Sequence, residues 1–197
     1  AWLSGRFGIR NGVISNVGSA AAFQIRKNDY GGPVPDNEVF PRQLRRHGLD
    51  TISFSNFADR HNAWHFMCGW SEFHTPNLKS GLETAAEVNS TVLPWLEKNA
   101  DRDDFFLHIN YWDAHRCYKM DASWADRFEG HPVDLAWPDE QAIRGHQEIK
   151  GPFTAHGQFK NDISPFPLMP GAIRNRDDFE KMVTAYDASI ACVDYHL

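Results

Sequence analysis

Four side chains that can bind or move charge come directly after one apolar run of the sequence. They are Asp113, His115, Arg116 and Tyr118. The run itself, 104–112, has the length of a strand and is rich in aromatic residues, which predicts a buried strand of a mostly parallel sheet. In open α/β sheets, ligands bind beyond the carboxyl ends of the strands. Imidazole and guanidinium groups placed there can hold an oxyanion and donate a hydrogen bond or a proton to a leaving oxygen.

A second pair of such groups, Arg60 and His61, follows another predicted strand at 51–57. Beyond this pair, His65 and His74 stand among aromatic residues, where two interpretations remain open. The segment forms either an anion or metal site in an aromatic-walled pocket, or a packed region in which each histidine is an ordinary hydrogen-bonding group. We take Arg60 and His61 from this segment as candidate site residues.

The sequence contains none of the usual signatures of a complete catalytic centre. The GxSxG, Walker, GxGxxG, HExxH and CxxC motifs are missing. Three cysteines, Cys68, Cys117 and Cys192, have neither zinc-ligand nor disulfide spacing, so we expect free thiols. The sequence assigns no metal ligand, and the candidate chemistry is that of cationic and imidazole groups at two strand ends.

Alternating helix and strand patterns are expected to position those groups. Amphipathic patterns predict helices at 36–47, 81–99 and 177–197. Gly48 fits the end of the first helix, whereas Pro94 is expected to kink the second helix or to start another. Helix, glycine and strand in succession are typical of a layered α/β protein, here a single domain spanning 1–197. The proline-rich residues 119–175 predict a substrate-facing loop region with short helices.

The composition excludes several classes of partner. The formal net charge is −6, which argues against nucleic acid and acidic membrane surfaces. No apolar stretch approaches the ~20 residues that a membrane helix needs. The first residues lack an initiator methionine and a signal pattern, and the last ones stop inside a helical pattern, so we expect a fragment of a longer protein. The sequence indicates neither a compartment nor an oligomeric state.

Four blocks of the sequence resemble the type I sulfatases of the alkaline-phosphatase-like superfamily. DFFLHINYWDAHRCY is similar to the family's strand PFFL followed by a DPHxPY turn, and SGR at 4–6 resembles the TGR that ends the signature CxPSRxxLLTGR. VFPRQLRRHGLDT resembles the family's TLAELLKEAGYxT unit, and AYDASIACVD resembles its YxAxIxxVD helix. The blocks appear in the family's order across nearly the whole chain. The resemblance implies an α/β/α sandwich with a mostly parallel sheet, incomplete in this chain, that hydrolyses sulfuric esters.

Several parts of a sulfatase centre have no counterpart in these residues. The resemblance places the residue converted to formylglycine before Ala1, and the ligands of a divalent cation, expected to be Ca²⁺, before Ala1 and after Leu197. The chain thus resembles a central fragment without the nucleophile signature and the metal-binding ends, and we expect it to be inactive alone. Ala114 and Cys117 also replace the two prolines of DPHxPY, and SNFADRH stands where the family has GKWH.

The resemblance also implies roles for the candidate residues. His115 would contact the sulfate or the leaving-group oxygen, and Arg60 and His61 would substitute for the lysine and histidine of GKWH; these three are the implied catalytic residues. Arg116 and Lys119 follow the same strand and are the predicted substrate-binding residues for an anionic sugar, with solvated surface charge as the open alternative for Lys119. The expected substrate is a small or carbohydrate sulfate ester, such as an aryl sulfate or a sulfated sugar.

Two alternatives remain open at this point. One is a phosphonate or phosphodiester hydrolase of the same superfamily, because the residues that would distinguish it are not among these 197. The other is a non-catalytic relative that binds anionic glycans. Replacing His115 by Ala in the complete protein separates them, since an enzyme would lose turnover by roughly 10² or more whereas a binder would keep its affinity.

Overall fold

A computed structural model describes residues 2–8, 12–15, 18–21, 39–115, 118, 120–149 and 172–197. The chain forms two compact units, Ala1–Tyr111 and Trp112–Leu197. The prediction of a single domain over 1–197 concerns the relation between the units and stays a prediction.

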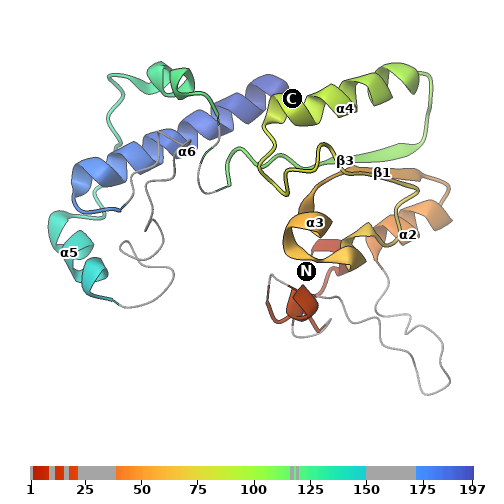
Figure 1. Ribbon diagram of the computed structural model, residues 1–197, viewed down its shortest axis with the longest axis horizontal. Coiled ribbons are helices and arrows are strands. Elements are labelled where there is room, and N and C mark those ends of the chain that lie inside the picture. The colour runs from red at the N-terminus through yellow and green to blue at the C-terminus, as the bar shows by residue number, and fades with distance from the viewer. Residues whose placement is uncertain are drawn as a thin grey trace. The chain divides into compact units, whose positions relative to one another are not determined.

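The first unit contains a three-stranded sheet in which all described strands are parallel (Figure 1). The strands are β1 (Asp50–Phe54), β2 (Glu72–His74) and β3 (Phe105–Ile109). Their order is β2-β1-β3, so the chain passes across β1 to reach β3 after leaving β2. The carboxyl ends of all three strands therefore lie at one edge of the sheet. Two of these strands, β1 and β3, are those that the sequence predicted at 51–57 and 104–112. Every residue of β3 is half-buried, whereas the sequence predicted a buried strand.

Helices cover both faces of this sheet (Figure 1). On one face, Ile52 and Phe54 of β1 pack against Val88 and Val92 of α4 (Ala85–Lys98). On the other face lie α2 (Phe40–Arg46), α3 (Phe57–His61) and the 3-10 helix η4 (Trp64–Met67). The core on that face consists of Leu3, Val39, Ala58, Phe66 and Trp70. The two faces of the sheet thus serve two cores, as the side-chain period of a strand dictates.

The helix α4 starts with a complete capping box. The Thr84 side chain accepts a hydrogen bond from the Glu87 backbone, and the Glu87 carboxylate accepts one from the Thr84 N–H. One helix continues through Pro94, which excludes a second helix starting there, whereas the kink expected as the other outcome stays a prediction. Leu82, which lies within the predicted helix 81–99, precedes α4 and is exposed, while Val88 lies in the core.

The short helix α2 begins later than its pattern predicted. Its N-cap is Val39, which makes no side-chain capping bond, and Pro41 occupies the first turn, where a missing N–H costs nothing. Residues 36–38, where the predicted helix starts, lie outside the described part of the chain. Gly48 ends the helix as predicted: its φ of +90° suits glycine, and its N–H donates to the Arg45 carbonyl at 3.1 Å.

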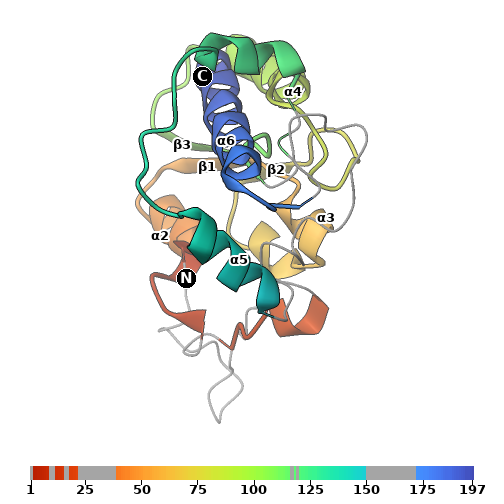
Figure 2. The ribbon, with the colours of Figure 1, turned by 90° about the vertical axis from the view of Figure 1, so that its left-hand side faces the viewer.

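The second unit is helical in its described parts (Figure 2). It contains the 3-10 helix η5 (Ala122–Phe128), α5 (Glu140–Glu148) and α6 (Arg176–His196). Met120 packs against Ala185, Ala188 and Cys192 of α6, and a second cluster joins α5 to the start of α6 through Ile143 and Ile173. Asn175 caps α6 by accepting a hydrogen bond from the Asp178 N–H at 2.8 Å.

Several sequence predictions for the second unit are confirmed. The helix predicted at 177–197 is α6, and the predicted short helices of the 119–175 region are η5 and α5. Residues 150–171 of that region lie outside the described part.

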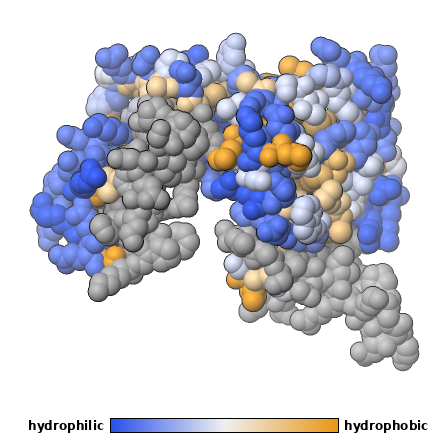
Figure 3. Space-filling model, in the orientation of Figure 1, coloured by the Kyte–Doolittle hydropathy of each residue, from blue (hydrophilic) through white to orange (hydrophobic). Residues whose placement is uncertain are grey.

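Cys68 and Cys192 are free thiols, whereas Cys117 is not described. Among the described helices, none is long and apolar enough to cross a bilayer. On the face drawn in Figure 3, hydrophobic side chains form small separate patches among hydrophilic ones.

Candidate functional site

Polar side chains gather where the strands of the first unit end. The Ser55 N–H donates to the His74 carbonyl at 2.9 Å, and the Asn110 N–H donates to the Phe54 carbonyl at 2.9 Å, which joins the three strand ends. The Ser55 hydroxyl also donates to Asn110 Oδ1 at 3.0 Å. The residues that share this edge and the loop above it form what we call the strand-end cluster: Ser55, Asn56, Arg60, Glu83 and Asn110.

Three members of the strand-end cluster hold the loop 76–83 in place. Asn56 Nδ2 donates to the Pro76 carbonyl at 2.6 Å, and Arg60 Nη1 donates to the Ser80 carbonyl at 3.0 Å. Glu83 Oε1 accepts a hydrogen bond from the Lys79 N–H at 2.8 Å. The loop contains left-handed residues, among them Ser80 at φ +52°, so it depends on these contacts for its shape.

Two oxygen atoms of this cluster are buried and have no hydrogen-bond partner among the described residues. They are Asn56 Oδ1 and Glu83 Oε2, and the two residues are 2% and 0% exposed. Most buried polar atoms in proteins are hydrogen-bonded, because an unpaired one costs roughly 1–3 kcal/mol. These two acceptors, together with the Arg60 guanidinium, give the edge of the sheet groups that can hold a donor and an anion.

Arg60 and His61 both lie in the last turn of α3, which follows β1. The His61 ring packs on Phe57, with ring centroids 4.6 Å apart. Successive residues of a helix point in different directions, so the two side chains diverge while sharing the carboxyl edge of the sheet. The structure thus brings Arg60 to the predicted location and shows a second role for it, since it donates to the backbone of the loop 76–83.

His115 belongs to the second unit, which starts at Trp112, whereas Arg60 and His61 belong to the first. Its N–H donates to the Trp112 carbonyl at 2.9 Å, and its ring meets the Trp112 ring edge-on at 5.3 Å. Arg116 and Lys119, the predicted substrate-binding residues, lie outside the described residues. That His115 shares one site with Arg60 and His61 stays a prediction.

Of the two histidines of the aromatic segment, His74 has a packing role. The His74 ring stacks on Phe54 at 4.4 Å and its Nε2 lies 3.2 Å from Glu72 Oε2. Burial alone would raise the pKa of Glu72, but hydrogen bonds from Trp95, Arg102 and His74 outweigh it and lower the pKa. Burial lowers the pKa of His65. No group of three or more potential metal-ligating side chains occurs among the residues described.

His108, in the middle of β3, is the most strongly perturbed histidine of the described residues. Burial lowers its pKa to about 4, so it is neutral at pH 7. Its Nδ1 lies 2.9 Å from the Ser53 hydroxyl, and the Trp2 and Trp70 rings lie 4.8 and 5.5 Å away. Its ring therefore packs between the sheet and the aromatic side chains that cover this face, and its hydrogen bond with Ser53 links β3 to β1.

Asn56, Glu83 and Asn110 were not predicted from the sequence. Each is a residue type that is common on protein surfaces and occupies no functional position of the family-like blocks, so residue type alone gave no signal. The position of two of them in the chain did carry a signal. Asn56 and Asn110 follow the ends of apolar strands, which is the location that favoured Arg60 and His115 as candidates. Glu83 carries no such signal, because its burial depends on the fold of the loop 76–83.

Comparison with known proteins adds no identification. No protein-family model matches the sequence, and no solved structure is significantly similar to the chain. A functional assignment therefore rests on the chain itself. Its first unit has an α/β fold with a parallel sheet, and polar side chains lie at the carboxyl ends of the strands.

Proposed function

We propose that this chain is part of a sulfuric ester hydrolase of the type I sulfatase family, with the alkaline-phosphatase-like α/β/α architecture. The observation that carries the proposal is the order of the four family-like blocks along the sequence. Their strand–turn block corresponds to β3, a parallel strand beside β1 in a sheet covered by helices on both faces. The expected substrate is a sulfated carbohydrate or an aryl sulfate.

In this proposal the cationic and imidazole groups act on the sulfate. The Arg60 guanidinium, which lies at the carboxyl edge of the sheet, would attract the sulfate oxygens. His61 and His115 would donate hydrogen bonds to the sulfate or to the ester oxygen as negative charge develops on it. Arg116 and Lys119 would bind the anionic part of the substrate. Water is consumed, and an alcohol and inorganic sulfate are the products.

The proposed family uses a formylglycine nucleophile and a divalent cation, Ca²⁺ by expectation. The described residues do not fit a cation site among themselves, since no three potential ligands converge. In the resemblance to the family, the nucleophile and the cation ligands correspond to residues outside these 197, and none of the roles above passes through them.

The test is hydrolysis of 4-nitrophenyl sulfate by the natural polypeptide that contains this chain. The proposal expects turnover that a chelator abolishes and that His115→Ala reduces by roughly 10²-fold or more. A parallel assay uses bis(4-nitrophenyl) phosphate, and a third measures binding of a sulfated glycan. Hydrolysis of the phosphodiester in place of the sulfate would replace the proposal by a phosphodiesterase. Glycan binding without hydrolysis of either ester would replace it by a non-catalytic glycan-binding protein.

A further inference from the structure

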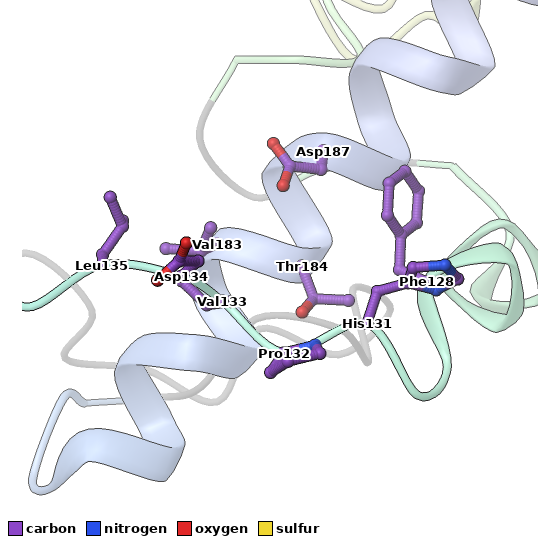
Figure 4. A pocket seen from close by; sticks show the side chains of 9 residues that line it. All are labelled: Phe128, His131, Pro132, Val133, Asp134, Leu135, Val183, Thr184 and Asp187. Carbon is purple, nitrogen blue, oxygen red and sulfur yellow. The ribbon is translucent and has the colours of Figure 1, made fainter.

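The second unit contains a pocket of ≈350 Å³ beside α6 (Figure 4). One wall comes from α6, through Val183, Thr184 and Asp187. The other wall comes from the end of η5 and the segment that follows it. Its lining residues are Phe128, His131, Pro132, Val133, Asp134 and Leu135. A volume near the lower limit of small-molecule sites suits a single ring-sized group.

Hydrogen bonds from Arg176 fix the shape of the second wall. The guanidinium donates to three backbone carbonyls of the segment: Pro138 at 3.0 Å, Val133 at 3.3 Å and Leu135 at 2.6 Å. Its Nε also donates to Glu180 Oε1, one turn further along α6, at 2.7 Å. Because Arg176 is the first residue of α6, the segment is tied to the helix that forms the opposite wall. The pocket is therefore preformed.

The lining combines apolar surface with hydrogen-bond acceptors. Five of the nine side chains are apolar, and the Phe128 ring provides an aromatic surface. The polar ones are the carboxylates of Asp134 and Asp187, the Thr184 hydroxyl and the His131 imidazole. Among the described residues, neither lysine nor arginine lines the pocket, so an anion placed in it would meet two negative charges. The site favours an uncharged ligand with several hydroxyl donors and a nonpolar face.

We infer that this pocket binds one unsulfated sugar ring. The C–H face of a sugar can stack on the Phe128 ring, while its hydroxyls donate charge-assisted hydrogen bonds to Asp134 and Asp187. The inference deepens the proposed function and rests on it in one respect: it makes the substrate a glycan in which an uncharged ring accompanies the sulfated one. Sugar binding itself needs no catalytic activity from the protein.

The experiment is a titration of the full chain with neutral methyl glycosides of glucose, galactose and N-acetylglucosamine, followed by NMR. The inference expects saturable binding of at least one glycoside, with weaker binding of its sulfated form because of the two carboxylates. Choline serves as the competing ligand class. Saturation by choline with no response to any glycoside would overturn the inference, as would the absence of saturable binding by the folded chain.

Matched variants locate the binding in the pocket. Asp187→Asn keeps the shape of the side chain and should weaken binding about tenfold or more, since it removes the charge from an acceptor. Thr184→Val, which replaces a hydroxyl by a methyl group, should weaken it less. Asp194→Asn changes a carboxylate of α6 that does not line the pocket and should leave the affinity unchanged. Equal affinities for wild type and Asp187→Asn would contradict the inference.

The outcomes also separate this inference from the proposed function. Hydrolysis of 4-nitrophenyl sulfate by the natural polypeptide without glycoside binding would remove the sugar pocket and leave the sulfatase proposal intact. Glycoside binding that Asp187→Asn weakens, without hydrolysis of a sulfate ester, would do the reverse.

Discussion

The two ends of the parallel sheet use charged groups in different ways. At the amino ends of the strands, Arg102 joins two of them: it forms ion pairs with Asp50, the first residue of β1, and with Glu72, the first residue of β2. Trp95 Nε1 adds a hydrogen bond to the Glu72 carboxylate at 2.8 Å. The hydrogen bonds that Arg102 donates to Glu72 and Asp50 raise its pKa. This end is held together by mutual charge pairing.

At the carboxyl ends the polar groups are only partly satisfied by the described residues. The Glu83 carboxyl group is fully buried but accepts one hydrogen bond through Oε1, leaving Oε2 unpaired, and Asn56 Oδ1 is likewise unpaired. The Arg60 guanidinium at this end donates to backbone carbonyls. The amino end thus pairs its charged groups with one another, whereas the carboxyl end leaves two buried acceptors unpaired among the described residues, which costs stability and is consistent with the binding role proposed for this end.

The largest expected effect is a loss of stability when a phenylalanine is removed, which should differ between the two ends of the sheet because the two side chains are buried to different degrees. Phe54, the last residue of β1, is fully buried, so Phe54→Ala should lower the free energy of unfolding by about 4 kcal/mol. Phe105, the first residue of β3, is half-buried, and Phe105→Ala should cost about half as much. Urea unfolding of both variants measures this. Equal losses would mean that the two ends do not differ in packing.

The free energy of unfolding should vary with pH because of His108, which lies in β3. Its folded pKa is about 4, below its ordinary value of 6.5, so the unfolded chain binds a proton first as the pH falls. Its contribution to stability is therefore complete above about pH 6.5 and is lost towards pH 4, by about 3 kcal/mol at most.

The combined variant His108→Phe with Ser53→Ala removes this titration together with its hydrogen-bond partner. The pH profile of the unfolding free energy is measured for this variant and for the wild type. Subtracting the first profile from the second isolates the histidine from the carboxylates. A difference that stays constant between pH 7 and pH 4 would show that His108 is not buried in its neutral form.

Two arginines provide a functional comparison of the ends. In the natural polypeptide, Arg60→Ala should lower kcat/KM for an aryl sulfate by roughly 10²-fold, or about 2.7 kcal/mol, because the proposed sulfate contact is lost. Arg102→Ala, at the amino end, should leave kcat/KM within a few fold while lowering the urea midpoint of unfolding modestly, since its ion pairs are partly exposed to solvent. A loss of activity from Arg102→Ala as large as that from Arg60→Ala would remove the functional distinction.

Local sequence patterns predicted the elements that carry this comparison. The apolar runs that became β1 and β3, the glycine at the end of α2 and the spacing of α6 all act over a few residues, so they are visible without the fold. At Pro94 the sequence left a kink or a second helix open, because proline disfavours a continuous helix locally, whereas packing of Val88 and Val92 against β1 and β3 supports one continuous helix.

The candidate site was only partly predictable. Arg60 was found from its position after a strand, but its hydrogen bonds to the loop 76–83 arise from contacts about twenty residues apart in sequence, which no local pattern contains. The same holds for Glu83, whose burial makes it unusual. The pocket beside α6 requires Arg176 to bind carbonyls about forty residues earlier, and the sequence indicated only that the region around it would face a ligand.

The most direct test of the contrast between the two ends is the unfolding free energy of Glu83→Gln measured beside that of Glu72→Gln. Glutamine at position 83 can still accept the hydrogen bond from the Lys79 N–H, and it removes the buried carboxyl group. The free energy of unfolding should therefore be unchanged or rise by about 1 kcal/mol. Glutamine at position 72 weakens the contacts with Arg102 and His74, so stability should fall by about 1 kcal/mol. A loss of stability from Glu83→Gln equal to that from Glu72→Gln would contradict the account, because both ends would then serve stability alone.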